Sequence, residues 1–384
     1  MYLVVRSIAD LHTAFSGGSA VDYLAIASAG RVVHGGSSCV YCAGSLAAAQ
    51  AQLLGYTPAS SATFPVPFVN PALMAWLIQP LALLPLQSGT DAFVALNVGA
   101  MALSAVILAR YASPRLGGPL AACVVVIVVF SLEAGTGILL GQSDGLMLLA
   151  ATLAVVALVR GRPVVAGLLL VPLLLKPQLV WLVPPVLVVA RQWRMLGALA
   201  AGAAIVVLGS IAVAGPGHLL DAFGLVTAPT YAHLDLQGNA IPALVARPLA
   251  SNAAAWAVAI ALAAIAVLAM VVMRDALRRN VVPAVAIGVG LSVMLSPHLG
   301  DYSLMLLAIP VAVLAPRAPA LTLALVAAYT AASLFNPLVP LNESTFAFVL
   351  LAGLVALVWL ATHPGSSDMT AYVPRRSAAG VSSA

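Results

Sequence analysis

The feature that most limits how this chain can fold is a succession of apolar runs, each about as long as a bilayer is thick. The runs follow one another from about Ala92 to Thr362, separated by short stretches of Pro, Gly and Arg. A transmembrane helix needs about 20 apolar residues, so the sequence predicts a chain that crosses a membrane many times. Only 7% of the residues are charged, against about 25% in soluble domains. This composition excludes a water-soluble enzyme.

We expect an all-α polytopic transmembrane bundle, in which the basic clusters between the apolar runs are cytoplasmic. Residues 71–86 are apolar but short and are interrupted by Pro80 and Pro85. We therefore expect a re-entrant or juxtamembrane segment there. We expect about eleven spans, at residues 92–110, 118–133, 143–159, 163–175, 178–190, 195–214, 252–273, 281–296, 301–315, 319–335 and 345–362.

This threading divides the chain into an outer segment with juxtamembrane helices (1–91), a transmembrane domain (92–362) and a disordered cytoplasmic tail (363–384). It places twelve of the sixteen Lys and Arg residues in the cytoplasm, as the positive-inside rule requires. The formal net charge of +5 therefore reflects the basic residues of the expected cytoplasmic loops. It does not indicate a nucleic-acid partner, because the arginines are spread over many short loops.

Polar side chains gather at the outer ends of the expected spans and in the first outer segment. A carboxylate, a cation, an imidazole and an amide that meet at one membrane face can bind an anionic head group and move a proton. The sequence therefore places a candidate site on the outer side. Its candidate residues are Asp22, Gln142, Asp144, Lys176, His298, Asp301 and Tyr302.

Lys176 is the only lysine in the chain and is followed by Pro177 at the tip of a short expected hairpin. A basic group within a membrane span is costly and usually functional, so we interpret Lys176 as an anion or phosphate contact. The alternative is a lysine that snorkels to the interface as an anchor. An outer position, against the positive-inside trend, weakens that alternative.

Local roles compete with the functional ones at the other candidates. Asp22 can act as a general base or as the N-cap of a helix. Asp144 and Asp301 each precede an apolar run, which favours capping. Gln142 can hydrogen-bond a neighbouring helix, and His298 can be an interfacial histidine as well as a head-group ligand.

Two further stretches of the outer side are notable. The long segment 215–251 contains aromatic and polar residues, including His218 and Asp221. It would suit a saccharide or lipid-head acceptor, with a solvated linker as the alternative. Cys39 and Cys42 form a lone C-x-x-C without a second pair of ligands, so we do not expect a metal site.

The order of several short motifs carries a resemblance to a known family. The motifs include Val21-Asp22-Tyr23, Gly30-Arg31, Pro67-Phe68-Val69-Asn70-Pro71, Gly141-Gln142, Lys176-Pro177-Gln178 and Ser296-Pro297-His298. With these motifs in this order, the chain resembles glycosyltransferase family 87, the polyprenyl-phosphate-mannose-dependent mannosyltransferases of the GT-C class. The resemblance implies a GT-C membrane bundle and a multi-pass plasma-membrane enzyme whose active site is extracytoplasmic.

The resemblance also implies inverting transfer of a hexose, expected to be mannose, from a β-linked polyprenyl-phosphate sugar to a lipid or glycan acceptor. Neither a nucleotide sugar nor a metal or other cofactor is implied. The family's first outer aspartate, its catalytic base, maps onto Asp22. Family members place a transmembrane helix before that aspartate, whereas the 21 residues before Asp22 contain no span-length apolar run. This departure predicts that the numbered chain begins after that helix.

We therefore expect Asp22 to accept the proton of the acceptor hydroxyl. Lys176 and His298 are expected to bind the donor phosphate. The expected substrate-binding residues are Gln142, Asp144, Asp301 and Tyr302. The alternative function is a multi-span lipid or solute transporter or flippase, which would show internal repeats and polar groups near the membrane midplane. A membrane scaffold is a third alternative, but it gives no reason for the position of the only lysine.

Overall fold

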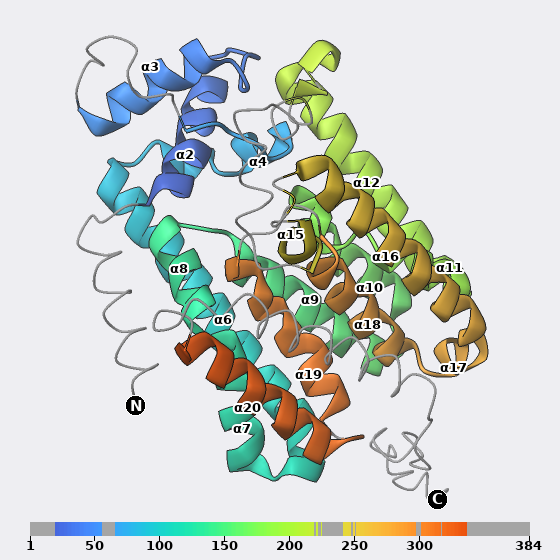
Figure 1. Cartoon of the computed structure of the whole chain (residues 1–384). Coiled ribbons are helices and arrows are strands. Elements are labelled where there is room, and N and C mark those ends of the chain that lie inside the picture. Colours follow the sequence, from blue (N-terminus) through green and yellow to red (C-terminus); the bar gives the residue numbers. More distant parts are fainter. Residues whose placement is uncertain are drawn as a thin grey trace, which may run out of the picture.

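The computed structural model describes residues 20–55, 66–218, 241–246, 251–296, 301–315 and 317–335, with residues 220, 221, 224 and 249. Every regular element in these ranges is a helix (Figure 1). The expected all-α class is therefore confirmed for this part of the chain. The expected span at 345–362 and the tail lie outside the described residues.

Four helices form a module at one end of the molecule (Figure 1, blue to cyan), which we call the outer module after the side expected from the sequence. They are α2 (Val21–His34), α3 (Ala43–Leu54), α4 (Ala72–Leu77) and α5 (Gln79–Ala82). The residues 71–86 thus form two short helices where the sequence predicts a re-entrant or juxtamembrane segment. Prolines separate the pieces because they cannot continue a preceding helix.

Small residues on α2 allow α4 and α5 to pack closely against it. A Cβ atom added to Gly30 would lie 2.8 Å from the Cβ of Ala82, which is too close for any larger side chain. Arg31 of α2 donates a hydrogen bond to the Ala82 carbonyl oxygen at 2.9 Å. These contacts hold the second half of α2 against α5, and α2 carries Asp22 near its other end.

Three helices among the described residues are long and apolar enough to cross a membrane. They are α6 (Leu86–Leu116), α12 (Trp193–Ala214) and α16 (Asn252–Val272). A fourth span arises if α7 (Gly118–Val129) and α8 (Leu132–Leu140), which meet at a bend of 47°, are counted together.

The remaining apolar runs also form helices, but these are shorter than a full crossing. Each expected span between residues 92 and 335 coincides with a helix or with consecutive helical pieces, so the structure supports the helices without establishing eleven spans. The shorter elements are α9 (Asp144–Val159), α10 (Pro163–Leu169), η1 (Val171–Leu175), η2 (Pro177–Leu179), α11 (Val183–Val189), η3 (Pro216–His218), α15 (Ile241–Ala246), α17 (Arg274–Arg279), α18 (Val281–Met294), η6 (Asp301–Leu307), α19 (Ala308–Leu314) and α20 (Pro319–Phe335).

The core of the bundle is built around α18. All residues from Val282 to Met294 are buried, and a helix that is apolar on every face belongs in the interior. The helices α9, α11 and α19 and the 3₁₀ helix η6 pack around it. This core fixes the first turns of α9 and η6, where Asp144, Asp301 and Tyr302 lie.

Candidate functional site

A cavity of about 630 Å³ lies between the outer module and the bundle. Its polar lining comes from α2, the segment between α8 and α9, the segment between η1 and η2, and η6. The apolar wall is formed by α12 and α16, where Val207 and Ile260 line the cavity and are exposed. The polar lining residues in this part are Asp22, Gln142, Lys176, Tyr302 and Ser303.

Asp22 is the second residue of α2, and Ala20 occupies the N-cap position. Asp22 is therefore not the N-cap residue of α2, which was the alternative role considered for it. Its carboxylate accepts a short hydrogen bond from the Gln142 side-chain amide. Burial raises the pKa of the Asp22 carboxyl above its ordinary value, while the Gln142 hydrogen bond and the charge of Lys176 oppose this rise.

Gln142 follows a helix end that only glycine can form. Gly141 closes α8 with φ 70°, and a Cβ atom there would lie 2.6 Å from the Cβ of Tyr23 on α2. The close approach brings Gln142 next to Asp22. A second bond from the Gln142 Nε2 goes to the Tyr302 hydroxyl at 3.0 Å, and Lys176 donates to the Gln142 Oε1. Because both ends of the amide are engaged, its orientation is determined.

Lys176 forms a buried ion pair with Asp144, and their side chains are only 8% and 0% exposed. The Lys176 Nζ lies 2.5 Å from one oxygen of Asp144, and the Ser303 hydroxyl donates to the other oxygen at 2.5 Å. The Nζ also lies 4.9 Å from the centre of the Tyr302 ring, a cation–π contact. Lys176 is thus held inside the protein, which does not fit the alternative of a snorkelling anchor.

The structure brings five of the seven predicted site residues together. Asp144 lies at the first position of α9, but its oxygens are engaged by Lys176 and Ser303, so its contacts are tertiary and not those of a helix cap. His298 and the side chain of Asp301 lie outside the described residues. Sequence reasoning missed Ser303, because a serine inside an apolar run carries no signal of its partner.

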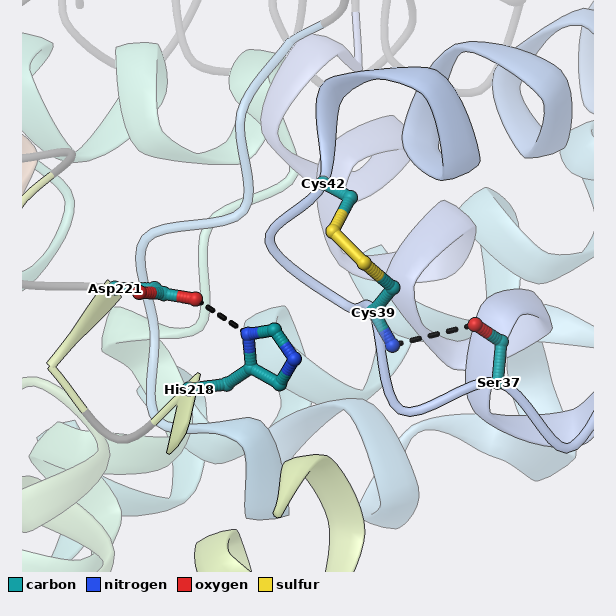
Figure 2. Close-up of a disulfide and its surroundings, with 5 residues drawn as sticks. All are labelled: Ser37, Cys39, Cys42, His218 and Asp221. Atoms are coloured by element: carbon teal, nitrogen blue, oxygen red, sulfur yellow. Dashed lines mark hydrogen bonds and ion pairs between the residues drawn. A yellow bond between two sulfur atoms is a disulfide. The ribbon is translucent and has the colours of Figure 1, made fainter. Parts of the chain in front are cut away.

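Further polar side chains of the cavity lining are His218 and Tyr41. His218, in η3 after α12, contacts Asp221 through Nδ1 at 2.5 Å. Tyr41, which lines the same cavity, lies in a loop closed by a disulfide between Cys39 and Cys42. Figure 2 shows the His–Asp pair together with this disulfide. The C-x-x-C pattern in the sequence did not predict that Cys39 and Cys42 are paired.

No cluster of three His, Cys, Asp or Glu side chains that could hold a metal ion occurs in the described part of the chain. The polar site instead consists of two carboxylates, one ammonium group, one amide and two hydroxyl groups. Such groups can accept a proton from a hydroxyl and donate hydrogen bonds to an anion. Acid–base chemistry next to an apolar wall suits a substrate with a polar head and a lipid tail.

The model of glycosyltransferase family 87 matches residues 68–297, which is well over half of the chain. The chain belongs to this family. It is therefore a glycosyltransferase, and its long apolar helices make it a membrane protein. The family match includes Gln142, Asp144 and Lys176, begins after Asp22 and ends before Tyr302. No curated protein and no solved structure matches this chain.

Proposed function

We propose that this family 87 member transfers a hexose, mannose by family resemblance, from a polyprenyl-phosphate sugar to a hydroxyl group of a lipid or glycan acceptor. The observation that carries the proposal is the convergence of Asp22, Gln142 and Lys176 at the polar side of a cavity whose other wall is apolar. A lipid-linked sugar has the same division into a polar head and an apolar tail.

In the proposed reaction, the acceptor hydroxyl attacks the anomeric carbon of the donor sugar from the face opposite the phosphate. The bond from that carbon to the phosphate oxygen breaks, and the electron pair leaves with the polyprenyl phosphate. Asp22 takes the proton of the hydroxyl. Attack on the opposite face inverts the configuration, so a β-linked donor yields an α-glycoside.

Gln142 is proposed to orient the base. Its amide nitrogen donates to Asp22 while its oxygen accepts from Lys176, so the Asp22 carboxylate is held through one of its oxygens. Burial raises the pKa of Asp22, which makes its ionised form a stronger proton acceptor. The carboxylate must still be ionised at the working pH, and the Gln142 hydrogen bond favours that state.

Lys176 is proposed to stabilise the phosphate as negative charge develops on the leaving oxygen. Its charge is balanced by Asp144, so the lysine would act chiefly as a directed hydrogen-bond donor. His298 is proposed to assist it, and Asp301 and Tyr302 are proposed to contact substrate. The reaction as proposed needs no nucleotide sugar, metal or other cofactor.

We also propose that the chain is a GT-C bundle of about eleven spans in the plasma membrane, with the site on the extracytoplasmic face. Two observations support an extracytoplasmic position of the site. Most of the arginines fall at the opposite ends of the expected spans. The outer module contains the Cys39–Cys42 disulfide, and disulfides persist in oxidising compartments.

The test is the substitution Asp22→Asn, which keeps the shape of the side chain but cannot accept a proton. We expect turnover to fall by about 10²- to 10⁴-fold, with donor binding largely intact. Lys176→Ala should weaken donor binding as well, because the lysine would contact the phosphate before and during the reaction. The assay uses radiolabelled polyprenyl-phosphate mannose with membrane extracts as the source of acceptor.

A matched control is available in α6. Asp91 accepts a hydrogen bond from Gln87 at 2.8 Å on the exposed side of the helix, so it is also a carboxylate paired with a glutamine amide. Asp91→Asn should leave transfer unchanged. Near-normal turnover in Asp22→Asn would show that another group is the base.

A further inference from the structure

Two polar side chains of the cavity wall, together with the carboxylate that pairs with one of them, are not used by the proposed chemistry. His218, Asp221 and Tyr41 come from two segments far apart in sequence, the start of the outer stretch after α12 and the loop between α2 and α3. Both His218 and Tyr41 line the same cavity as Asp22 and Lys176. Burial raises the pKa of Tyr41 to about 12, and the charge of Asp221 adds to the rise, as expected if the two side chains are near each other.

Tyr41 is held rigidly. The disulfide joins Cys39 to Cys42 (Figure 2). It closes a short loop, and Tyr41 lies in that loop. The Tyr41 hydroxyl donates to the carbonyl oxygen of Asn70 at 3.0 Å, and its ring stacks on Phe68 with centroids 5.8 Å apart. A side chain fixed by a covalent link, a hydrogen bond and a ring contact forms a pre-organised wall.

The His218–Asp221 pair is more accessible than the inner site. The exposed fractions of the two side chains are 35% and 43%, against 8% and 0% for Lys176 and Asp144. His218 contacts Asp221 through Nδ1, so the Nε2 edge of the ring faces away from that carboxylate. Imidazole nitrogens can donate to or accept from a hydroxyl group, and carboxylate oxygens accept from hydroxyl groups.

We propose that His218 and Asp221, with the disulfide-closed loop of Tyr41 as a fixed wall, bind the hydroxyl-bearing sugar or polyol head of the acceptor. This assignment rests on the proposed function, because it places the acceptor at this pair and the donor phosphate at Lys176. A neutral polyol fits this pair better than an anion does, since the carboxylate of Asp221 repels negative charge.

The experiment measures transfer by the membrane-embedded chain and by Asp221→Asn and His218→Ala. Radiolabelled polyprenyl-phosphate mannose is the donor, and octyl α-mannoside and membrane extract are the two acceptor sources. Release of free mannose to water is followed in parallel, because it requires the donor site but no acceptor. Asp221→Asn is nearly isosteric and keeps the fold testable if His218→Ala is poorly folded.

We expect Asp221→Asn and His218→Ala to raise the KM for acceptor by about tenfold or more, the effect of losing a hydrogen bond to a charged group. The KM for donor and the rate of mannose release to water should not change. The matched control is Asp275→Asn in α17, which removes another i,i+3 ion pair, at 3.4 Å from Arg278. It should change none of these values.

An unchanged KM for acceptor in both variants would overturn the proposal. The His218–Asp221 contact would then be an ion pair without a role in acceptor binding. A raised donor KM with an unchanged acceptor KM would also overturn it and assign the pair to the donor. Activity retained in Asp22→Asn, or no transfer by the unsubstituted chain to either acceptor source, would instead overturn the proposed function and the acceptor site with it.

Discussion

The buried pair of Lys176 and Asp144 allows a quantitative test of how the site is held together. Removing either partner leaves a charge inside the protein, but the two charges are left in different surroundings. In Lys176→Met, the Asp144 carboxylate is 0% exposed and keeps the hydrogen bond from Ser303. In Asp144→Asn, the Lys176 ammonium keeps its hydrogen bond to Gln142 and its cation–π contact with the Tyr302 ring. It also borders the cavity.

The two substitutions should therefore differ in cost. Breaking a buried pair by removing one partner typically costs about 3–5 kcal/mol, and we expect Lys176→Met to reach this range. Asp144→Asn should cost about 1–3 kcal/mol, the range for losing a hydrogen-bond partner of a group that keeps other partners. The double variant should lose less than the sum of the single losses, because its second substitution removes the charge left unpaired by the first.

The measurement is a titration of the purified protein in mixed micelles with sodium dodecyl sulfate, followed by tryptophan fluorescence. Gln87→Ala, at the exposed pair in α6, is a control that should shift the unfolding midpoint little. The reasoning would be refuted if Lys176→Met were as stable as the unsubstituted chain, or if the two single losses simply added in the double variant.

Three further outcomes are expected. Gln142→Leu should move the acid limb of the kcat/KM profile to higher pH: the base works only when ionised, and loss of the hydrogen bond that lowers the Asp22 pKa raises that pKa. Gly145→Ala should destabilise the protein by about 1–3 kcal/mol in the same titration, because the new Cβ atom would lie 2.5 Å from a backbone oxygen of α6. A topology reporter should read cytoplasmic after Arg194 and external near Gly217; a cytoplasmic reading near Gly217 would contradict the threading.

The helices themselves could be predicted because each apolar run ends at a local signal. The start of α12 after Arg191, the break around Pro177 and the end of α16 before Arg274 are all visible in the sequence. Which of these helices cross the membrane completely could not be predicted from the apolar runs alone. A run such as 281–296 has the composition of a span, and only the packing of its neighbours shows that α18 is surrounded by protein.

The gathering of Asp22, Gln142 and Lys176 could be predicted from topology, because all three were expected at the same membrane face. The pairing of Lys176 with Asp144 could not. The apolar run after Asp144 favours a capping role, and a contact between residues 32 positions apart depends on how η1 and α9 pack. The disulfide was missed for a similar reason: its formation depends on a turn that brings the Cα atoms of Cys39 and Cys42 to 5.2 Å.

The exposed apolar wall of the cavity, with Val207 on α12 and Ile260 on α16, has a kinetic consequence. A lipid-linked donor that reaches the site past these residues would arrive by diffusion in two dimensions, within the bilayer leaflet. Its effective concentration would then be its mole fraction among the surrounding amphiphiles. Adding detergent at a constant total amount of donor should slow the reaction, because the same molecules are spread over more micellar surface.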